Sequence, residues 1–215
     1  MTRTAIHRRM LLGASAALLA AAGSPVGATA DDTAAAVAPI QQLCNMLMAI
    51  MRAGQSVPFA QRFDQLAPVV AKSFNLDTIL QVSVGPTWPT LPPDQQAMLK
   101  AAFRRYTVAS YVSNFDEYSG QRFEISPTVR ALANGEQVVA TRIIPRDPSG
   151  ETHVLDYVMR QGPQGWQAVD VLMDGTISRV AVQRSDFRDL LARGGATALA
   201  KSLQEKTANL SGGSA

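Results

Sequence analysis

The residues best suited to acid–base chemistry lie late in the chain, in segments with strand-like alternation. Asp156 and Asp170 fall on neighbouring predicted strands, and paired carboxylates can act as general acid and base. The alternative interpretation is that they pair across strands with Arg142 or Arg160. His153 alternates with strand neighbours, which is more typical of a surface or half-buried residue than of a catalytic one. The pattern therefore favours structural roles for these side chains.

Nucleophilic and metal-based chemistry have little support. Cys44 is the only cysteine and lies in a Met-rich helical segment without a nearby His, which predicts a buried core thiol. One cysteine excludes an intrachain disulfide framework and a Cys-rich zinc site, and two His argue against a His-built metal site. The Gly-x-Ser-x-Gly, HExxH, P-loop and Rossmann patterns are missing. We therefore expect a protein that is not an enzyme and uses no metal or cofactor.

The charge balance argues against nucleic acid as a partner. The chain has 20 Lys and Arg against 17 Asp and Glu, a formal net charge of +3. The excess comes from Arg3, Arg8 and Arg9, because the first 30 residues contain no acidic residue. The remainder is formally neutral and lacks the electrostatic footprint of a nucleic-acid-binding protein. The hydrophobic content of 47% is enough for a sizeable core.

Residues 1–30 have the three parts of a cleaved export signal. A basic segment ends in Arg8-Arg9, residues 10–22 are apolar but short for a membrane span, and Ala28-Thr29-Ala30 is an A-x-A cleavage site. The arginine pair and the apolar residues after it partly match a twin-arginine signal, so the Sec and twin-arginine routes both stay open. These features predict export to the periplasm.

The segment after the signal reads as one domain over residues 31–209 with a Ser/Gly-rich flexible tail over 210–215. No segment after the signal reaches the length expected of a membrane helix, which predicts a soluble protein. We expect it to be a monomer.

The first half of this domain has helical periodicity. Apolar residues recur at steps of three and four in a stripe that Gly54 ends: Ile40, Leu43, Leu47 and Ile50. Residues 31–38 are expected to be a loose lead-in. A second helix opens at Pro58 and is expected to break or restart at Pro68.

Two further helices precede the strands. Asp77 is predicted to cap a short helix over residues 78–84, which Gly85-Pro86 stops. After a proline-rich turn, a long helix is predicted over residues 94–118. One row of this helix is rich in aromatic residues: Leu99, Phe103, Thr107, Tyr111 and Phe115.

From Gly120 onward the hydrophobic period changes from three or four to two. Strands are predicted from Phe123 and over residues 137–144, 152–160 and 166–173, with an edge segment over 129–133. Short turns join them, including Asn134-Gly135. This is an antiparallel meander of about four strands and not a βαβ series, so a Rossmann sheet is disfavoured.

The end of the domain returns to helix. Residues 177–182 are expected to precede a helix that starts at Ser185, and Gly194-Gly195 is expected to end it before a last helix over 196–206. The fold class is therefore α+β, with a small twisted antiparallel sheet packed against several helices.

A small sheet wrapped by amphipathic helices can leave an apolar cleft between the layers. We expect one wall of such a cleft on a single sheet face: Val139, Ile143, Val154, Val158, Val169 and Val171. The opposite wall is expected from Trp88, Leu91, Phe103, Tyr106, Tyr111, Phe115 and Phe187. Each of these residues has an alternative interpretation as ordinary core.

A series of short motifs, in order, resembles the MlaC or toluene-tolerance family. The motifs run from Arg62-Phe63-Asp64-Gln65-Leu66 through Val84-Gly85-Pro86-Thr87-Trp88 and Phe115-Asp116-Glu117-Tyr118-Ser119-Gly120 to Gly165-Trp166-Gln167-Ala168-Val169-Asp170-Val171. The resemblance covers roughly residues 37–206. The leader and core together look closest to the hopanoid-associated HpnM branch of this family.

The resemblance implies an NTF2-like sheet and a periplasmic protein that binds lipid tails between sheet and helices. The implied ligand is a phospholipid or a hopanoid. The implied partners are an inner-membrane transporter of the ABC or RND type and an outer-membrane lipoprotein complex. Two alternatives stay open: an enzyme of NTF2-like fold that uses Asp156 or Asp170, and an envelope scaffold protein with no cavity.

Overall fold

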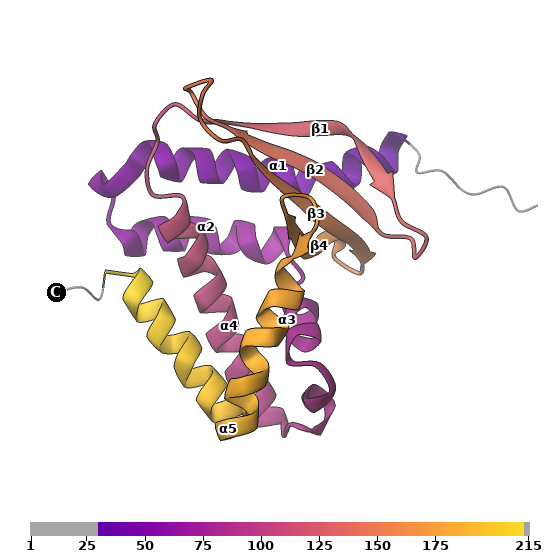
Figure 1. The fold of residues 1–215 in the computed structure, drawn as a ribbon, viewed down its shortest axis with the longest axis vertical. Helices are drawn as coiled ribbons and strands as arrows, with labels where there is room; N and C mark the ends of the chain where they lie inside the picture. Colours follow the sequence, from indigo (N-terminus) through magenta and orange to yellow (C-terminus); the bar gives the residue numbers. More distant parts are fainter. Residues whose placement is uncertain (1–29, 213–215) are drawn as a thin grey trace, which may run out of the picture.

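The computed structural model describes residues 30–212 and shows a sheet with α1 and α2 set above a group of upright helices (Figure 1). The helices are α1 (Ala30–Ala53), α2 (Phe59–Ser73), α3 (Leu76–Val84), α4 (Pro93–Asn114) and α5 (Arg179–Leu210), with short 3-10 turns at Gly54–Ser56 and Gly85–Thr90. The strands are β1 (Arg122–Ala131), β2 (Gln137–Ile144), β3 (His153–Gly162), β4 (Gly165–Met173) and β5 (Ile177–Ser178).

The α+β class predicted from the sequence is confirmed. The sheet has five strands in the order β1-β2-β3-β4-β5, and every neighbouring pair is antiparallel. The expected number was about four, and the extra strand is the two-residue β5, which is too short to leave a period-two pattern. The predicted edge segment 129–133 is the second half of β1, whose register shifts between Ile125 and Val129.

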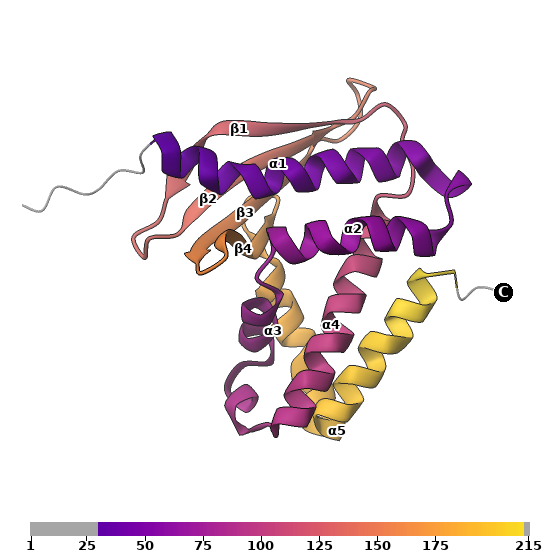
Figure 2. The same cartoon turned by 180° about the vertical axis from the view of Figure 1, so that it is seen from behind.

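The helices cover one face of the sheet. Figure 2 shows α1 lying along this face with α2 beside it, while α3, α4 and α5 extend away from the sheet. The apolar stripe predicted for the first helix forms this contact, because Ile40, Leu43, Leu47 and Ile50 are all buried. These side chains belong to one core cluster with sheet residues such as Val139 and Tyr157.

The segment Ala30–Ser56 is apolar and long enough to cross a membrane by length and composition alone. This corrects the expectation that no segment after the signal reaches that length. In the structure, α1 buries its apolar stripe against the sheet and α2, as the core helix of a globular domain does. The predicted export signal over residues 1–30 lies outside the described residues except for its last residue.

Two expectations for the early helices are wrong. Residues 31–38 continue α1 rather than forming a loose lead-in, and Ala36 is completely buried. Helix α2 continues through Pro68. Proline removes one backbone hydrogen bond, but Leu66 and Val70 on either side of it are fully buried, and this packing holds the helix together.

The start of α3 also differs from the expectation. Asn75 is the N-cap, because its side chain accepts a hydrogen bond from the backbone N–H of Thr78 at 3.0 Å. Asp77 lies in the first turn instead and forms ion pairs with Lys100 and Arg104 of α4, both at 2.9 Å. These pairs join α3 to α4.

Helix α5 begins at Arg179, six residues before the expected Ser185, with Ser178 as its N-cap. The predicted break at Gly194-Gly195 is confirmed, because both residues leave the helical conformation and Gly195 has φ +63°. Glycine takes such a left-handed conformation without steric cost. The two arms of α5 therefore form a V that is open toward the sheet (Figure 1).

We predict that Leu47→Ala lowers the free energy of unfolding by about 2–5 kcal/mol, because Leu47 is fully buried in the α1 contact and truncation leaves a cavity. Urea denaturation followed by circular dichroism measures the change. The control is Val82→Ala on the exposed side of α3, where the change should stay within about 0.5 kcal/mol. Equal effects of the two substitutions would contradict the assignment of α1 to the core.

Candidate functional site: a cavity between the sheet and the helices

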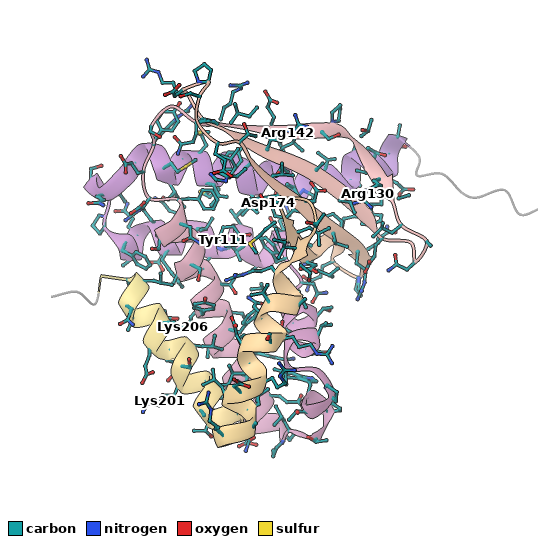
Figure 3. All side chains as sticks on the ribbon, in the orientation of Figure 1. Tyr111, Arg130, Arg142, Asp174, Lys201 and Lys206 are labelled. Carbon is teal, nitrogen blue, oxygen red and sulfur yellow. The ribbon has the colours of Figure 1, made fainter. Side chains whose placement is uncertain are left out.

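A cavity of about 580 Å³ lies where the end of the sheet meets the helices. It lies within the usual size range of small-molecule sites. Its walls come from α4, the first arm of α5, the ends of β2, β3 and β4, and the α2–α3 junction. Figure 3 shows two of its residues, Tyr111 and Asp174, at this junction of the layers.

The buried part of the cavity lining is mainly apolar. Phe74, Ile79, Phe103 and Val180 are each at least nine-tenths buried, and Gln183 is the one polar residue buried to the same degree. Aromatic rings continue from this floor, because Phe74 lies 5.6 Å from the ring centroid of Tyr111, which stacks on Phe115 at 5.9 Å. Such offset aromatic contacts give a rigid apolar surface.

The rim of the cavity is polar. Asn114, His153, Asp174 and Arg179 line the cavity and are all exposed. Within residues 30–212 the side chains of these four residues form no hydrogen bond or ion pair. The cavity therefore grades from an apolar floor to a rim of unpaired polar groups.

Two tyrosines lie beside the floor, the half-buried Tyr111 and the fully buried Tyr157. Burial raises the pKa of Tyr111 and of Tyr157 above the ordinary tyrosine value, so both phenols stay neutral. The positive charge of Arg179, which also lines the cavity, acts in the opposite direction on the pKa of Tyr111. Neutral phenols suit an apolar ligand better than phenolates do.

Asp170 borders the cavity, but its carboxylate is occupied by hydrogen bonds to the protein. It accepts hydrogen bonds from the Ser178 hydroxyl, from the N–H of Val180 at 3.1 Å and from the N–H of Val171 at 2.7 Å. The carboxylate thus caps the start of α5 and fastens this helix to the sheet. A residue held in this way is a poor candidate for a general acid or base.

Asp156 does not line this cavity. The strand register places it on the same sheet face as Asp170, because Asp156 pairs with Leu172 and Val158 pairs with Asp170, but its side chain does not border the cavity. Burial raises the pKa of its carboxyl group, and Arg130 partly offsets this effect. The cavity therefore does not bring the two carboxylates together, as the enzyme alternative requires. Within residues 30–212 no group of three or more His, Cys, Asp and Glu side chains is arranged to hold a metal.

The structure brings seven of the predicted wall residues to the cavity. They are Phe103, Tyr106, Tyr111, Phe115, Ile143, Val154 and Val171. Four others pack in or against the core cluster and do not line the cavity: Trp88, Leu91, Val139 and Phe187. Phe187, for example, packs edge-to-face on Phe103 at 6.3 Å, behind the cavity floor.

The expectation that the five valines and one isoleucine of the predicted sheet wall share one sheet face is wrong. Val139 and Val171 both pair with Tyr157 on the helix-covered face, whereas Val158 pairs with Val138 on the other face. Val154 lies four positions before Val158 on β3, so alternation places both on the face away from the helices. Val154 nevertheless borders the cavity, because it lies at the end of the sheet. Val158 and Val169 form a separate small cluster with Val138.

A β-bulge explains the position of Val169. Val158 pairs with Asp170 but the next residue, Met159, pairs with Ala168, so Val169 is an extra residue on β4. An extra residue reverses the alternation of the strand beyond it. Val169 and Val171 therefore lie on opposite faces although they are two positions apart.

Sequence reasoning missed several cavity residues. Phe74 ends α2 and Ile79 lies within the short helix α3, both outside the long aromatic row. The predicted walls also leave out the polar part of the lining: Thr107, Ser110, Asn114, His153, Asp174, Arg179 and Gln183. The spacing of Thr107, Ser110 and Asn114 on one side of α4 is a signal that was present in the sequence.

The basic residues of the helical layer are mostly engaged elsewhere. Arg104 pairs with Asp77, and Arg105 lies 5.8 Å from the ring centroid of Phe63. Arg184 approaches Gly85 on the side of α5 that faces away from the cavity. Arg179 is the arginine that lines the cavity itself.

Together these features define an α+β protein in which a curved sheet and a helical layer enclose an apolar cavity with a polar rim. The family model described as MlaC protein matches residues 41–205. This chain belongs to the MlaC family.

Comparisons with individual proteins agree with the fold. A solved phospholipid-binding protein from Ralstonia solanacearum, in complex with a phospholipid, superposes with a TM-score of 0.68 at 21% sequence identity. The match covers 81% of this chain and 98% of that chain. At this identity the likeness shows a common fold. A comparison with curated proteins gave no match.

We predict that Asp170→Asn lowers the free energy of unfolding by about 1–3 kcal/mol, because it removes a charged acceptor from three donors, two of them at the start of α5. Chemical denaturation checks this value. Asp186→Asn, an exposed change on α5, should cost less than about 0.5 kcal/mol. If Asp170→Asn leaves stability unchanged, the carboxylate does not fasten α5 to the sheet.

We also predict that Cys44 is unreactive in the folded protein. Burial raises the pKa of its thiol to about 12, so the thiolate that reacts with disulfide reagents is almost absent at pH 8. A thiol-specific chromogenic disulfide should label the protein only after guanidinium unfolding. Rapid labelling under native conditions would place Cys44 outside the core.

Proposed function

We propose that the protein is a periplasmic lipid carrier that takes lipid tails into the cavity between its sheet and its helices. The single observation that carries this proposal is the grading of the cavity from an apolar floor to an unpaired polar rim. An amphiphile has the same grading, with tails that avoid water and a headgroup that prefers it. Membership of the MlaC family and the fold shared with a phospholipid-binding protein support the same proposal.

The energetics of tail burial are sufficient for a carrier. Each buried CH₂ group contributes about 0.8 kcal/mol, so a chain of about 16 carbons gives a gross gain near 12 kcal/mol before the costs of binding. Such a gain needs no charged partner inside the cavity. Because a carrier must release its cargo, we expect net affinity well below this upper bound.

The proposed cargo is a phospholipid or a hopanoid, moved between machinery of the inner and outer membranes. The phospholipid is supported by the complex of the Ralstonia solanacearum protein. The hopanoid is supported by the resemblance of the sequence to the HpnM branch. Both lipids have an apolar body and a polar end, which match the apolar floor and the polar rim of the cavity.

The proposed setting follows from the export signal over residues 1–30 and the neutral charge of the domain. The carrier is a periplasmic monomer exported by the Sec or the twin-arginine route. Its proposed partners are an inner-membrane transporter of the ABC or RND type and an outer-membrane lipoprotein complex. A cavity-free scaffold is less consistent with the 580 Å³ space between the layers.

We predict that gently purified protein carries phospholipid or hopanoid in near-stoichiometric amount, because an apolar cavity of this size is more stable when a tail fills it. Native mass spectrometry, followed by solvent extraction and lipid analysis, identifies the cargo. Repeatedly empty preparations from cells that contain both lipids would contradict the proposal.

Val171→Glu should reduce retained lipid at least tenfold, because it places an unpaired carboxylate on a cavity wall where tails are buried. The control is Val82→Glu at an exposed position of α3, which should retain lipid like the unchanged protein. Circular dichroism separates loss of binding from loss of fold. Val139→Glu is unsuitable because Val139 is fully buried in the core and the change should unfold the chain.

A further inference from the structure

The rim of the cavity carries two opposite charges that are not paired with each other. Asp174 and Arg179 lie at the two ends of the short segment that joins β4 to α5, and both line the cavity. Both side chains are exposed, and neither takes part in an ion pair within residues 30–212. Two opposite charges at one opening are thus available to a ligand.

The backbone fixes the position of Asp174. Its φ of +51° is the one left-handed conformation of a non-glycine residue in the described part of the chain, and its N–H donates to the Val154 carbonyl oxygen at 2.9 Å. Aspartate and asparagine tolerate this conformation better than most residues do. The turn therefore places the Asp174 carboxylate at the cavity rather than leaving it on a mobile loop.

The other ionisable groups at the cavity add no further unpaired charge to those of Asp174 and Arg179. The Asp170 carboxylate is satisfied by three donors, two at the start of α5 and one on β4. His153 is exposed at the rim. Tyr111 is neutral because burial raises its pKa. The charges that remain free are one negative and one positive.

A third unsatisfied group lies deeper on the α4 wall. The Ser110 hydroxyl lines the cavity, is buried and has no hydrogen-bond partner within residues 30–212. A buried hydroxyl without a partner costs free energy that a ligand oxygen would recover. Asn114, one turn further along α4, brings a free amide to the rim.

We propose that this rim recognises a zwitterionic phospholipid headgroup, with Arg179 binding the phosphate and Asp174 binding the ammonium group. The Ser110 hydroxyl donates to an ester carbonyl oxygen of the glycerol backbone, between the headgroup and the tails. This inference rests on the proposed function and narrows its cargo. A purely anionic headgroup meets Asp174 without a cation to balance it, and an uncharged polycyclic lipid uses neither charge.

The experiment is a competition for the full mature chain. Delipidated protein is incubated with vesicles that contain equal amounts of phosphatidylethanolamine, phosphatidylglycerol and diacylglycerol with identical acyl chains. Native mass spectrometry then gives the ratio of the three bound lipids. We expect phosphatidylethanolamine to be preferred about three- to tenfold over each competitor, as charge-assisted contacts at an exposed rim allow.

Substitutions of Arg179 and Asp174 test the two charges separately, because each charge is expected to control a different lipid preference. Arg179→Gln should remove the preference for phosphatidylethanolamine over diacylglycerol, and Arg179→Lys should retain most of it. Asp174→Asn, which keeps a residue tolerant of positive φ, should remove the preference over phosphatidylglycerol. The matched controls are Arg188→Gln and Asp186→Asn, which remove the same charges from exposed positions of α5 that do not line the cavity.

The outcomes separate this inference from the proposed function. Equal binding of the three lipids by the unchanged protein, or unchanged ratios in both rim variants, overturns headgroup recognition while the carrier function stands. An equal loss of all three lipids in a rim variant also overturns it, because the effect is then on the cavity and not on the headgroup. Failure of the unchanged protein to bind any of the lipids overturns both.

Discussion

The contact between the sheet and the helical layer depends on a chain of aromatic rings. Tyr157 on β3 lies 6.1 Å from Phe74, which lies 5.6 Å from Tyr111 on α4, and the stack continues through Phe115 to Phe123 on β1. Rings of this size bury much apolar area and hold two layers at a fixed separation. Phe74, Tyr111 and Phe115 of this chain also line the cavity, which lies between the two layers.

The second requirement is that α5 leaves the sheet at a defined angle. Asp170 fastens the first turn of α5 to β4, and the bend at Gly194-Gly195 turns the second arm back along α4. The cavity then has one helical wall from α4 and one from the first arm of α5. A carboxylate that looked like a candidate for catalysis is therefore part of what shapes the site.

Burial and charge divide the cavity into two functional parts. The floor holds mainly apolar side chains, so it suits tails of many kinds. The rim holds polar groups that the protein itself leaves unpaired, so selectivity for one cargo over another is expected to arise there. A carrier built in this way keeps general apolar affinity separate from headgroup preference.

The sequence by itself determined most of the helices and strands, the α+β class and the apolar faces of the long helices, because helices and strands repeat their apolar residues with periods of 3.6 and 2. It did not determine every boundary, since residues 31–38 are helical and α5 begins at Arg179. It did not determine which set of alternating strand residues faces the helices, and the bulge at Val169 changed that set within one strand. Only the tertiary structure decided that Trp88 and Phe187 fill the core while Phe74 and Ile79 line the cavity. It also decided that Asp174 and Arg179 meet at one opening, because that depends on a left-handed turn and on where α5 begins.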